Sequence, residues 1–139
     1  MKKICAFLMA TILIVLTGIP VHAAIPDYPV SPQYSIIEAC DVDLIINRSS
    51  GVASCYASGY ADGTYRVVIE YKLQRYMGSY WGTIKTWTSS GTSFASLEQT
   101  WAVSSGYTYR GHATCWVYDS AGNLLERGSV SKTYSYPSN

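Results

Sequence analysis

The residues of this chain with the greatest potential for covalent chemistry are its cysteines. Cys40, Cys55 and Cys115 follow an apolar N-terminal segment that contains a fourth, Cys5. In an oxidising compartment such thiols pair as disulfides, and an odd number leaves one over. We expect a Cys55–Cys115 disulfide, because both residues lie in segments where apolar residues alternate with polar ones. A Cys40–Cys55 disulfide is the alternative, and an unpaired Cys40 is either a buried thiol or a bridge between two chains.

Catalysis has little support in the sequence. Beyond the N-terminal segment the only imidazole is that of His112, and no pattern links it to a nucleophile. Two carboxylates can cleave glycosidic bonds when they are held about 5 to 9 Å apart, but no spacing here predicts such a pair. Zinc, phosphate-loop and Ser-His-Asp motifs are absent from the sequence. We therefore expect no catalytic residue, no metal and no cofactor, with a small hydrolase as a minor alternative.

A flat aromatic surface is the stronger candidate for a site. Every second residue of the segment 107–118 is expected to face water, beside Arg66, Glu70 and Lys72 of a neighbouring strand. Tryptophan and tyrosine rings stack on sugars and anchor protein partners. The alternative is that Trp116 is partly covered and that Arg110 pairs with Glu70. The candidate ligand-binding residues are Arg110, His112, Trp116 and Tyr118.

A second aromatic cluster surrounds Gly78 and Ser79. Tyr80, Trp81 and Trp87 are predicted to form an aromatic rim at one end of the domain. The spacing of these rings fits neither face of a regular strand, so a β-bulge is expected to redirect one of them. The alternative role for these rings, and the expected role of Trp101, is core filling.

The N-terminus has the order of features found in a secretory signal peptide. Lys2 and Lys3 precede an apolar run, and the small residues Ala23 and Ala24 follow it. Residues 1–23 are therefore expected to be a cleaved signal peptide and the mature protein to be secreted and extracellular. An uncleaved membrane anchor is the alternative, since such a run can just span a bilayer. Residues 24–33 contain prolines and predict an extended leader, which leaves 34–139 as a single domain.

Charge argues against nucleic acid and membrane surfaces as partners. Without Lys2 and Lys3 the chain has eight basic and nine acidic side chains, and the basic ones are scattered along it. Binding to phosphate backbones and anionic lipids needs clustered Lys and Arg. We therefore expect no nucleic acid, and no membrane contact after signal cleavage.

The remaining sequence predicts strands and no helix. Thirteen tyrosines and four tryptophans occur among many Ser, Thr and Gly residues, a composition that favours pleated sheets. Asp62-Gly63 is a strong signal for a two-residue hairpin, so the segments on either side of it are expected to pair with each other. Seven strands at this spacing are typical of an antiparallel β-sandwich. The expected strands are 36–47, 51–60, 65–74, 81–87, 94–103, 107–118 and 124–134.

Two resemblances extend this reading. Residues 103–109, Val-Ser-Ser-Gly-Tyr-Thr-Tyr, resemble the corner before the sixth strand of immunoglobulin-like and fibronectin type III domains, which implies that Tyr109 is the corner tyrosine. Cys115 lies six residues after Tyr109, whereas antibody domains place the cysteine two after, so the likeness is one of layout. The motifs ending at Gln74, Trp87 and Arg110, with the signal, also resemble small secreted proteins of Gram-positive gut bacteria, a resemblance that implies no catalytic or binding residue.

These observations favour a secreted, non-enzymatic β-sandwich that binds an extracellular polysaccharide or protein. The aromatic residues on an expected solvent face are the basis for this hypothesis. The alternative is a structural, self-assembling protein of the cell surface, built through exposed sheet edges or a Cys40 bridge.

Overall fold

The computed structural model describes residues 35–138. The predicted signal peptide and leader, residues 1–23 and 24–33, lie outside this part of the chain. The described part consists of strands and connections, and it contains no helix long and apolar enough to cross a membrane. The strands are β1 (Ile37–Asn47), β2 (Val52–Ala61), β3 (Arg66–Tyr76), β4 (Trp81–Thr92), β5 (Phe94–Ala102), β6 (Tyr107–Tyr118) and β7 (Leu124–Tyr136).

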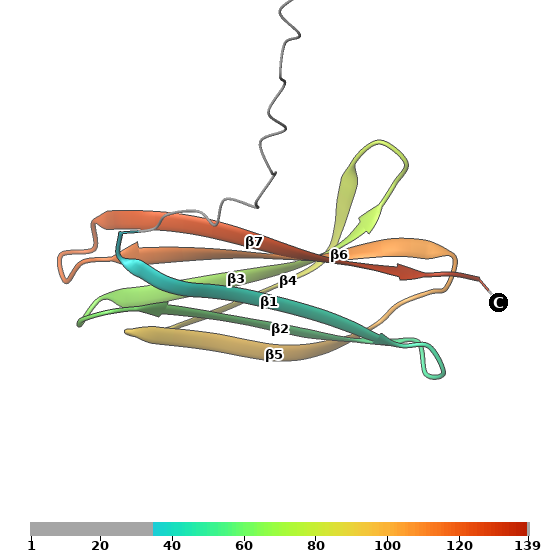
Figure 1. Ribbon diagram of the computed structural model, residues 1–139, viewed down its shortest axis with the longest axis horizontal. Helices are drawn as coiled ribbons and strands as arrows, with labels where there is room; N and C mark the ends of the chain where they lie inside the picture. Colours follow the sequence, from blue (N-terminus) through green and yellow to red (C-terminus); the bar gives the residue numbers. More distant parts are fainter. Residues whose placement is uncertain (1–34, 139) are drawn as a thin grey trace, which may run out of the picture.

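The strands form two antiparallel sheets packed face to face. One sheet has the order β1-β2-β5 and the other β4-β3-β6-β7. In Figure 1, β6 and β7 (orange and red) belong to one layer, and β2 and β5 (green and ochre) to the other. The expected all-β antiparallel sandwich of about seven strands is therefore confirmed.

Alternation of side chains explains how each sheet buries one face. Successive residues of a strand point to opposite sides, so every second residue can enter the core. The apolar residues of β3 and β6 on the inner side are fully buried, whereas their outward neighbours are mostly half-exposed. The core residues of these two strands are Val67, Ile69, Tyr71, Leu73, Tyr109, Ala113, Cys115 and Val117.

The predicted hairpin at Asp62-Gly63 is wrong. Gly63 has the positive φ expected of a turn, at 96°, but β2 and β3 belong to different sheets. Ser93 accounts for the difference, because its carbonyl accepts from Ala61 N (2.9 Å) and its amide donates to Tyr65 O (2.8 Å). Ser93 thus holds the end of β2 and the start of β3 apart, and the chain crosses from one sheet to the other.

β4 is longer than predicted. The expected strand 81–87 stops before Ser89-Ser90-Gly91, yet Arg66–Glu70 of β3 pairs with residues 88–92 and extends β4 to Thr92. The change of sheet occurs one residue later, at Ser93, whose φ of 64° is left-handed. The hydrogen bonds available from β3 therefore outweigh the weak strand preference of Ser and Gly.

The β-bulge predicted between Trp81 and Trp87 is present. Leu73 pairs with Lys85 and the next residue, Gln74, pairs with Thr83, so the residue between them in β4 has no partner. An extra residue reverses the side on which later side chains point. Trp81 therefore faces outward with Tyr76, whereas Trp87 faces the core and lies 6.1 Å from the ring of Tyr71.

Tyr109 lies at the corner before β6, the position that the resemblance of residues 103–109 implied. The side chain is 1% exposed, and its hydroxyl donates to Ser104 O (2.7 Å) and accepts from Ser104 N (3.1 Å). These two bonds connect the β5–β6 connection to the buried start of β6. Tyr109 thus holds the first residues of β6 in place, and with them the start of the row of outward-facing side chains on this strand.

Glu126 holds the beginning of β1 against β7. Its carboxylate accepts from the backbone amides of Ser35 (2.8 Å), Ile36 (2.8 Å) and Ile37 (2.6 Å). Partial burial raises the pKa of this carboxyl, but the hydrogen bonds from these amides outweigh burial and lower it overall. The carboxylate is therefore more acidic in the folded chain than in the unfolded one.

This clamp predicts a pH-dependent loss of stability. A carboxyl with a lowered folded pKa stabilises above its unfolded pKa, and the contribution disappears as pH falls through the folded value. Glu126→Gln should cost about 1 kcal/mol at pH 7, allowing for solvent screening, and almost nothing near pH 3. Urea unfolding at both pH values measures this. Glu98→Gln, at an exposed position of β5, is the control, and an equal deficit at both pH values would contradict the clamp.

Candidate functional site

The outer face of the four-stranded sheet carries all four predicted ligand-binding residues. Arg110, His112, Trp116 and Tyr118 point outward from β6 and are each half-buried. β3 adds residues 66, 68, 70, 72 and 74 as their register partners on one side, and β7 adds a row of Ser, Thr and Arg on the other. We call this surface the arginine–aromatic face, defined by Arg66, Trp81, Arg110, Trp116, Tyr118 and Arg127.

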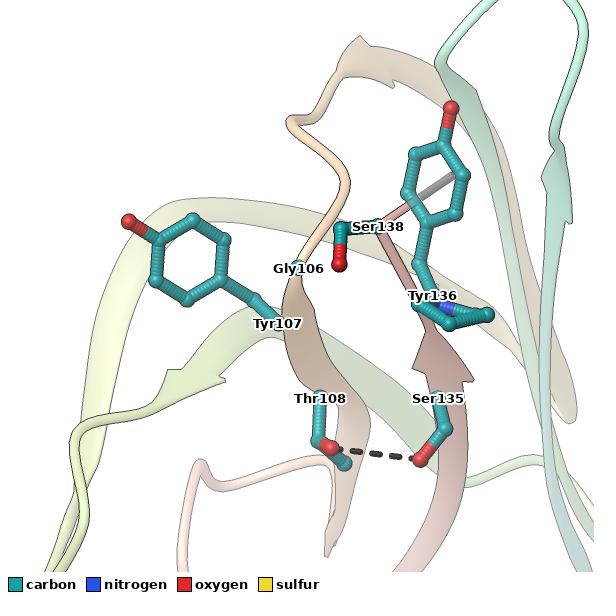
Figure 2. A pocket seen from close by; sticks show the side chains of 7 residues that line it. Gly106, Tyr107, Thr108, Ser135, Tyr136 and Ser138 are labelled. Carbon is teal, nitrogen blue, oxygen red and sulfur yellow. Dashed lines mark hydrogen bonds between the residues drawn. The ribbon is translucent and has the colours of Figure 1, made fainter.

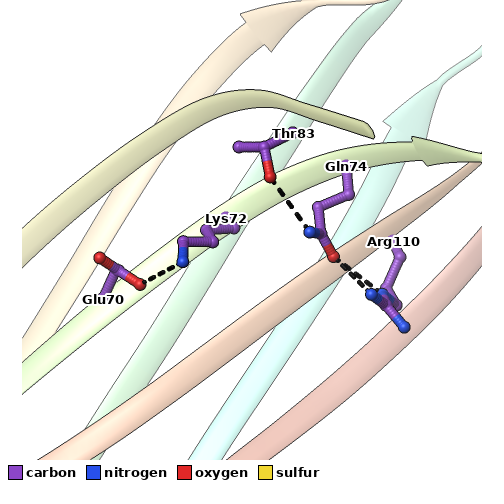
Figure 3. A network of polar contacts seen from close by, with 5 residues as sticks. All are labelled: Glu70, Lys72, Gln74, Thr83 and Arg110. Carbon is purple, nitrogen blue, oxygen red and sulfur yellow. Dashed lines mark hydrogen bonds and ion pairs between the residues drawn. The ribbon is translucent and has the colours of Figure 1, made fainter. Parts of the chain in front are cut away.

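Arg110 is the best-anchored cation of this face. Its Nε and Nη2 donate to Gln74 Oε1 at 2.9 and 2.7 Å, and its guanidinium lies 4.4 Å from the centre of the Trp81 ring. Gln74 is 8% exposed and donates in turn to Thr83 Oγ1 at 3.1 Å (Figure 3). The chain of hydrogen bonds across β6, β3 and β4 therefore holds the guanidinium over the indole.

The other two arginines of the face also cover aromatic rings. The guanidinium of Arg66 lies 4.8 Å from the centre of the Tyr118 ring, and that of Arg127 lies 5.8 Å from a ring of Trp116. Both pairs are direct cross-strand partners, on β3–β6 and β6–β7 respectively. Such contacts are worth roughly 0.5–1 kcal/mol at exposed sites. The face is thus built from repeated arginine–ring pairs.

Glu70 and His112 complete the polar surface. Glu70 pairs with Lys72 at 3.0 Å and not with Arg110, so the predicted alternative of an Arg110–Glu70 pair is wrong (Figure 3). His112 Nδ1 hydrogen-bonds with Ser131 Oγ at 2.7 Å. Burial lowers the pKa of His112, and the cations Arg110 and Lys72 lower it further. The imidazole is therefore neutral at pH 7.

The three residues of the predicted second rim lie at three different locations. Trp81 joins the arginine–aromatic face, and its ring lies 5.3 Å from that of Tyr76. Tyr80 is 61% exposed at the tip of the β3–β4 hairpin, which projects from the sandwich as the yellow-green loop of Figure 1. Trp87 packs toward the core, and Trp101, expected in the core, is 39% exposed at its edge against Trp87.

Charge is distributed unequally between the two sheets. Among the described strands, β1, β2 and β5 contain no Lys or Arg, whereas β3, β4, β6 and β7 contain all of them. The outer face of the four-stranded sheet has four cations and the single carboxylate of Glu70. The opposite sheet presents Asp43 and Glu98 on either side of the exposed Tyr56. The arginine–aromatic face is therefore the basic side of a chain that is nearly neutral.

A shallow pocket of about 270 Å³ lies where β6 begins and β7 ends. Figure 2 shows Tyr107 and Tyr136 on opposite sides of it, with Thr108 Oγ1 and Ser135 Oγ 3.2 Å apart between the strands. Its lining residues supply hydroxyl and backbone groups, and none of them has a carboxylate, imidazole or thiol. Elsewhere in residues 35–138, no three His, Cys, Asp or Glu side chains are grouped as metal ligands.

The predicted Cys55–Cys115 disulfide is wrong for this structure. Cys40, Cys55 and Cys115 are all free thiols, and both Cys55 and Cys115 are fully buried. Burial raises the pKa of the Cys55 thiol. Cys55 and Cys115 both face the core as expected, but Cys55 lies opposite Leu44 whereas Cys115 lies at Gly59, four residues further along β2.

Sequence reasoning missed two residues of the face. Gln74 orients Arg110 but was assigned no role, because a buried glutamine in an alternating strand gives no distinct signal. Arg127 reaches Trp116 only through the β6–β7 register, which shifts between Val117 and Tyr118.

No protein-family model matches the chain, and no curated protein matches its sequence. The chain's own geometry therefore carries the functional argument.

Proposed function

We propose that this protein is a secreted, non-enzymatic binding module and that its arginine–aromatic face binds an acidic surface of an extracellular protein. The observation that carries the proposal is the set of three arginines placed over aromatic rings on the basic face. Trp, Tyr and Arg are the residue types that contribute most to protein–protein binding energy. Their fixed positions on a rigid sheet reduce the entropy lost on binding.

The same pairs favour a protein over a neutral polysaccharide as the partner. A sugar stacks on the open face of a ring, and Trp81 has Arg110 on one side and Tyr76 nearby. A sugar would have to displace the guanidinium, whereas a carboxylate can bind its free N–H groups while the arginine stays on the ring. The excess of cations on this face supports an acidic partner for the same reason.

We also propose an immunoglobulin-like type for the sandwich. Its support is the division into β1-β2-β5 and β4-β3-β6-β7, together with the hydrogen bonds of Tyr109 at the corner before β6. Sandwiches of this type present sheet faces and loops to partners and serve many unrelated functions. The site, and not the fold, therefore determines the proposed role.

Binding can be tested with protein collected from the culture medium after expression of the full chain. The probes are the extracellular proteins of the producing organism and a panel of insoluble polysaccharides. We expect a protein partner whose retention falls at least about 30-fold with Arg110→Ala or Trp116→Ala, as for hot-spot residues. Raised salt should slow its association.

Trp101→Ala is the matched control, because it removes another exposed, cation-covered tryptophan outside the face. This variant should bind normally, and circular dichroism verifies that all three variants fold. Retention on a polysaccharide that depends on Trp116 would replace the protein partner with a glycan. Binding unchanged by either face variant would overturn the site itself.

A further inference from the structure

Cys115 fills a space next to Cys40 that exists because residue 59 is glycine. Cys40 on β1 faces the core and is the cross-strand partner of Gly59 on β2. A Cβ built on Gly59 would lie 2.7 Å from Cys115 Sγ, so this sulfur occupies the place of the missing side chain. Cross-strand partners have Cα atoms only about 4.5–5.5 Å apart. The thiol from β6 therefore lies beside the strand position that Cys40 shares.

The two thiols also interact directly. Interaction between the side chains of Cys40 and Cys115 raises the pKa of Cys40 and lowers that of Cys115. Opposite shifts of this kind are what two thiols in direct contact produce, because only one of the two sulfurs can easily carry a negative charge. Cys40 and Cys115 thus approach each other from opposite sheets at Gly59, where no side chain separates them.

Cys55 is excluded from both of the pairs expected from the sequence. The cross-strand register partner of Cys55 on β1 is Leu44. Cys55 also lies four residues from Gly59 along β2, a separation of about 13 Å in a strand. A disulfide needs Cα atoms within about 7 Å. Cys40 and Cys115 both lie at the height of Gly59, so Cys55 reaches neither without a shift of the sheet.

We propose that Cys40 and Cys115 are the site of a disulfide that joins β1 of one sheet to β6 of the other. The oxidant is an exogenous disulfide, small or protein-borne, of the kind that acts during folding outside the cytosol. During folding, before the sheets close over Cys115, the thiolate of one of the two cysteines attacks a sulfur of the oxidant, forms a mixed disulfide and releases a thiolate. The other cysteine then attacks the protein sulfur of the mixed disulfide and expels the second thiolate. The protein loses two electrons and two protons, and the oxidant becomes two thiols.

The bond would connect the two layers where they have no backbone hydrogen bonds in common. It closes a long loop that contains β2, β3, β4 and β5, which restricts the unfolded chain most strongly. We expect oxidation to raise the melting temperature by about 15 °C. Cys55 should remain a reduced, buried thiol that reacts only after unfolding.

Peptide mapping of the full chain tests the pairing. The protein is refolded with oxidised glutathione, unfolded at low pH, alkylated and digested without reduction. We expect one cross-linked peptide pair containing Cys40 and Cys115, an alkylated Cys55, and an intact mass lower by two hydrogens. Alkylation of Cys40, Cys55 and Cys115 together, or a cross-link that includes Cys55, would overturn the proposal.

Thermal unfolding with and without a reductant gives a second readout. Reduction should lower the melting temperature of wild type and of the matched control Cys55→Ser, and it should leave Cys40→Ser unchanged. Cys40 is half-buried whereas Cys115 is buried, so a serine hydroxyl is tolerated better at position 40 than at position 115. If both variants fail to fold, the peptide map of the wild-type chain decides. Equal responses of wild type and Cys40→Ser to reductant would contradict the bond.

Discussion

Gly111→Ala is expected to destabilise the protein by about 3 kcal/mol. A Cβ at this position would lie 2.0 Å from the hydroxyl oxygen of Tyr71 and 2.7 Å from its Cζ. Tyr71 is fully buried, and its hydroxyl donates to Asp43 O at 3.1 Å, so the ring is held from both sheets and has no space to move. Denaturant unfolding followed by tryptophan fluorescence measures the change.

Gly82→Ala is the matched control for this substitution. Its Cβ would lie 3.2 Å from Cγ of the exposed Met77, a flexible side chain that can move aside. In a Tyr71→Phe background, Gly111→Ala should cost less, because the nearest atom of the ring is gone, and the double-mutant cycle reports this coupling. A Gly111→Ala variant as stable as Gly82→Ala would refute the close packing of Tyr71 on β6.

Tyr109→Phe should cost about 2 kcal/mol, because it removes the hydroxyl that forms two hydrogen bonds with the backbone of Ser104. The ring stays in place, so the loss reports on the corner and not on core volume. The largest local change is expected in the connection between β5 and β6, where amide hydrogen exchange should become faster. Thermal and urea unfolding provide the free energy.

Tyr107→Phe makes the same chemical change two residues earlier. Tyr107 is 43% exposed, and its ring rather than its hydroxyl contacts the guanidinium of Arg75, at 4.5 Å. Loss of the Tyr107 hydroxyl should change the free energy of unfolding by no more than about 0.5 kcal/mol. Similar costs for the two variants would mean that the corner bonds of Tyr109 contribute nothing specific.

Local alternation predicts the strands of this protein well, but not which strands become neighbours. The period-two pattern of residues 65–74 predicted β3 to within two residues at each end, because one buried face leaves that pattern in any sheet. The pairing at Asp62-Gly63 was wrong, because a turn signal reports φ at Gly63 and does not specify which sheet the next strand joins. Ser93, which is distant in sequence, hydrogen-bonds to both sides of this turn where the chain passes from one sheet to the other.

The candidate site shows the same division. Arg110, His112, Trp116 and Tyr118 could be placed on one face, because they follow from strand alternation alone. Their partners could not, since Gln74 and Arg127 depend on the register of β3 and β7 against β6. The predicted cysteine pairing was wrong for a related reason. Apolar alternation places Cys55 and Cys115 in the core, but their positions along the core depend on how the two sheets pack.

The separation of charge between the two sheets has a consequence at a distance. With cations on the four-stranded sheet and only carboxylates on the strands of the other, the molecule carries an electric dipole across its thickness. A negatively charged surface exerts a torque on such a dipole once the two are within about one Debye length, ~8 Å at physiological salt. The molecule therefore turns its basic side toward that surface before they touch.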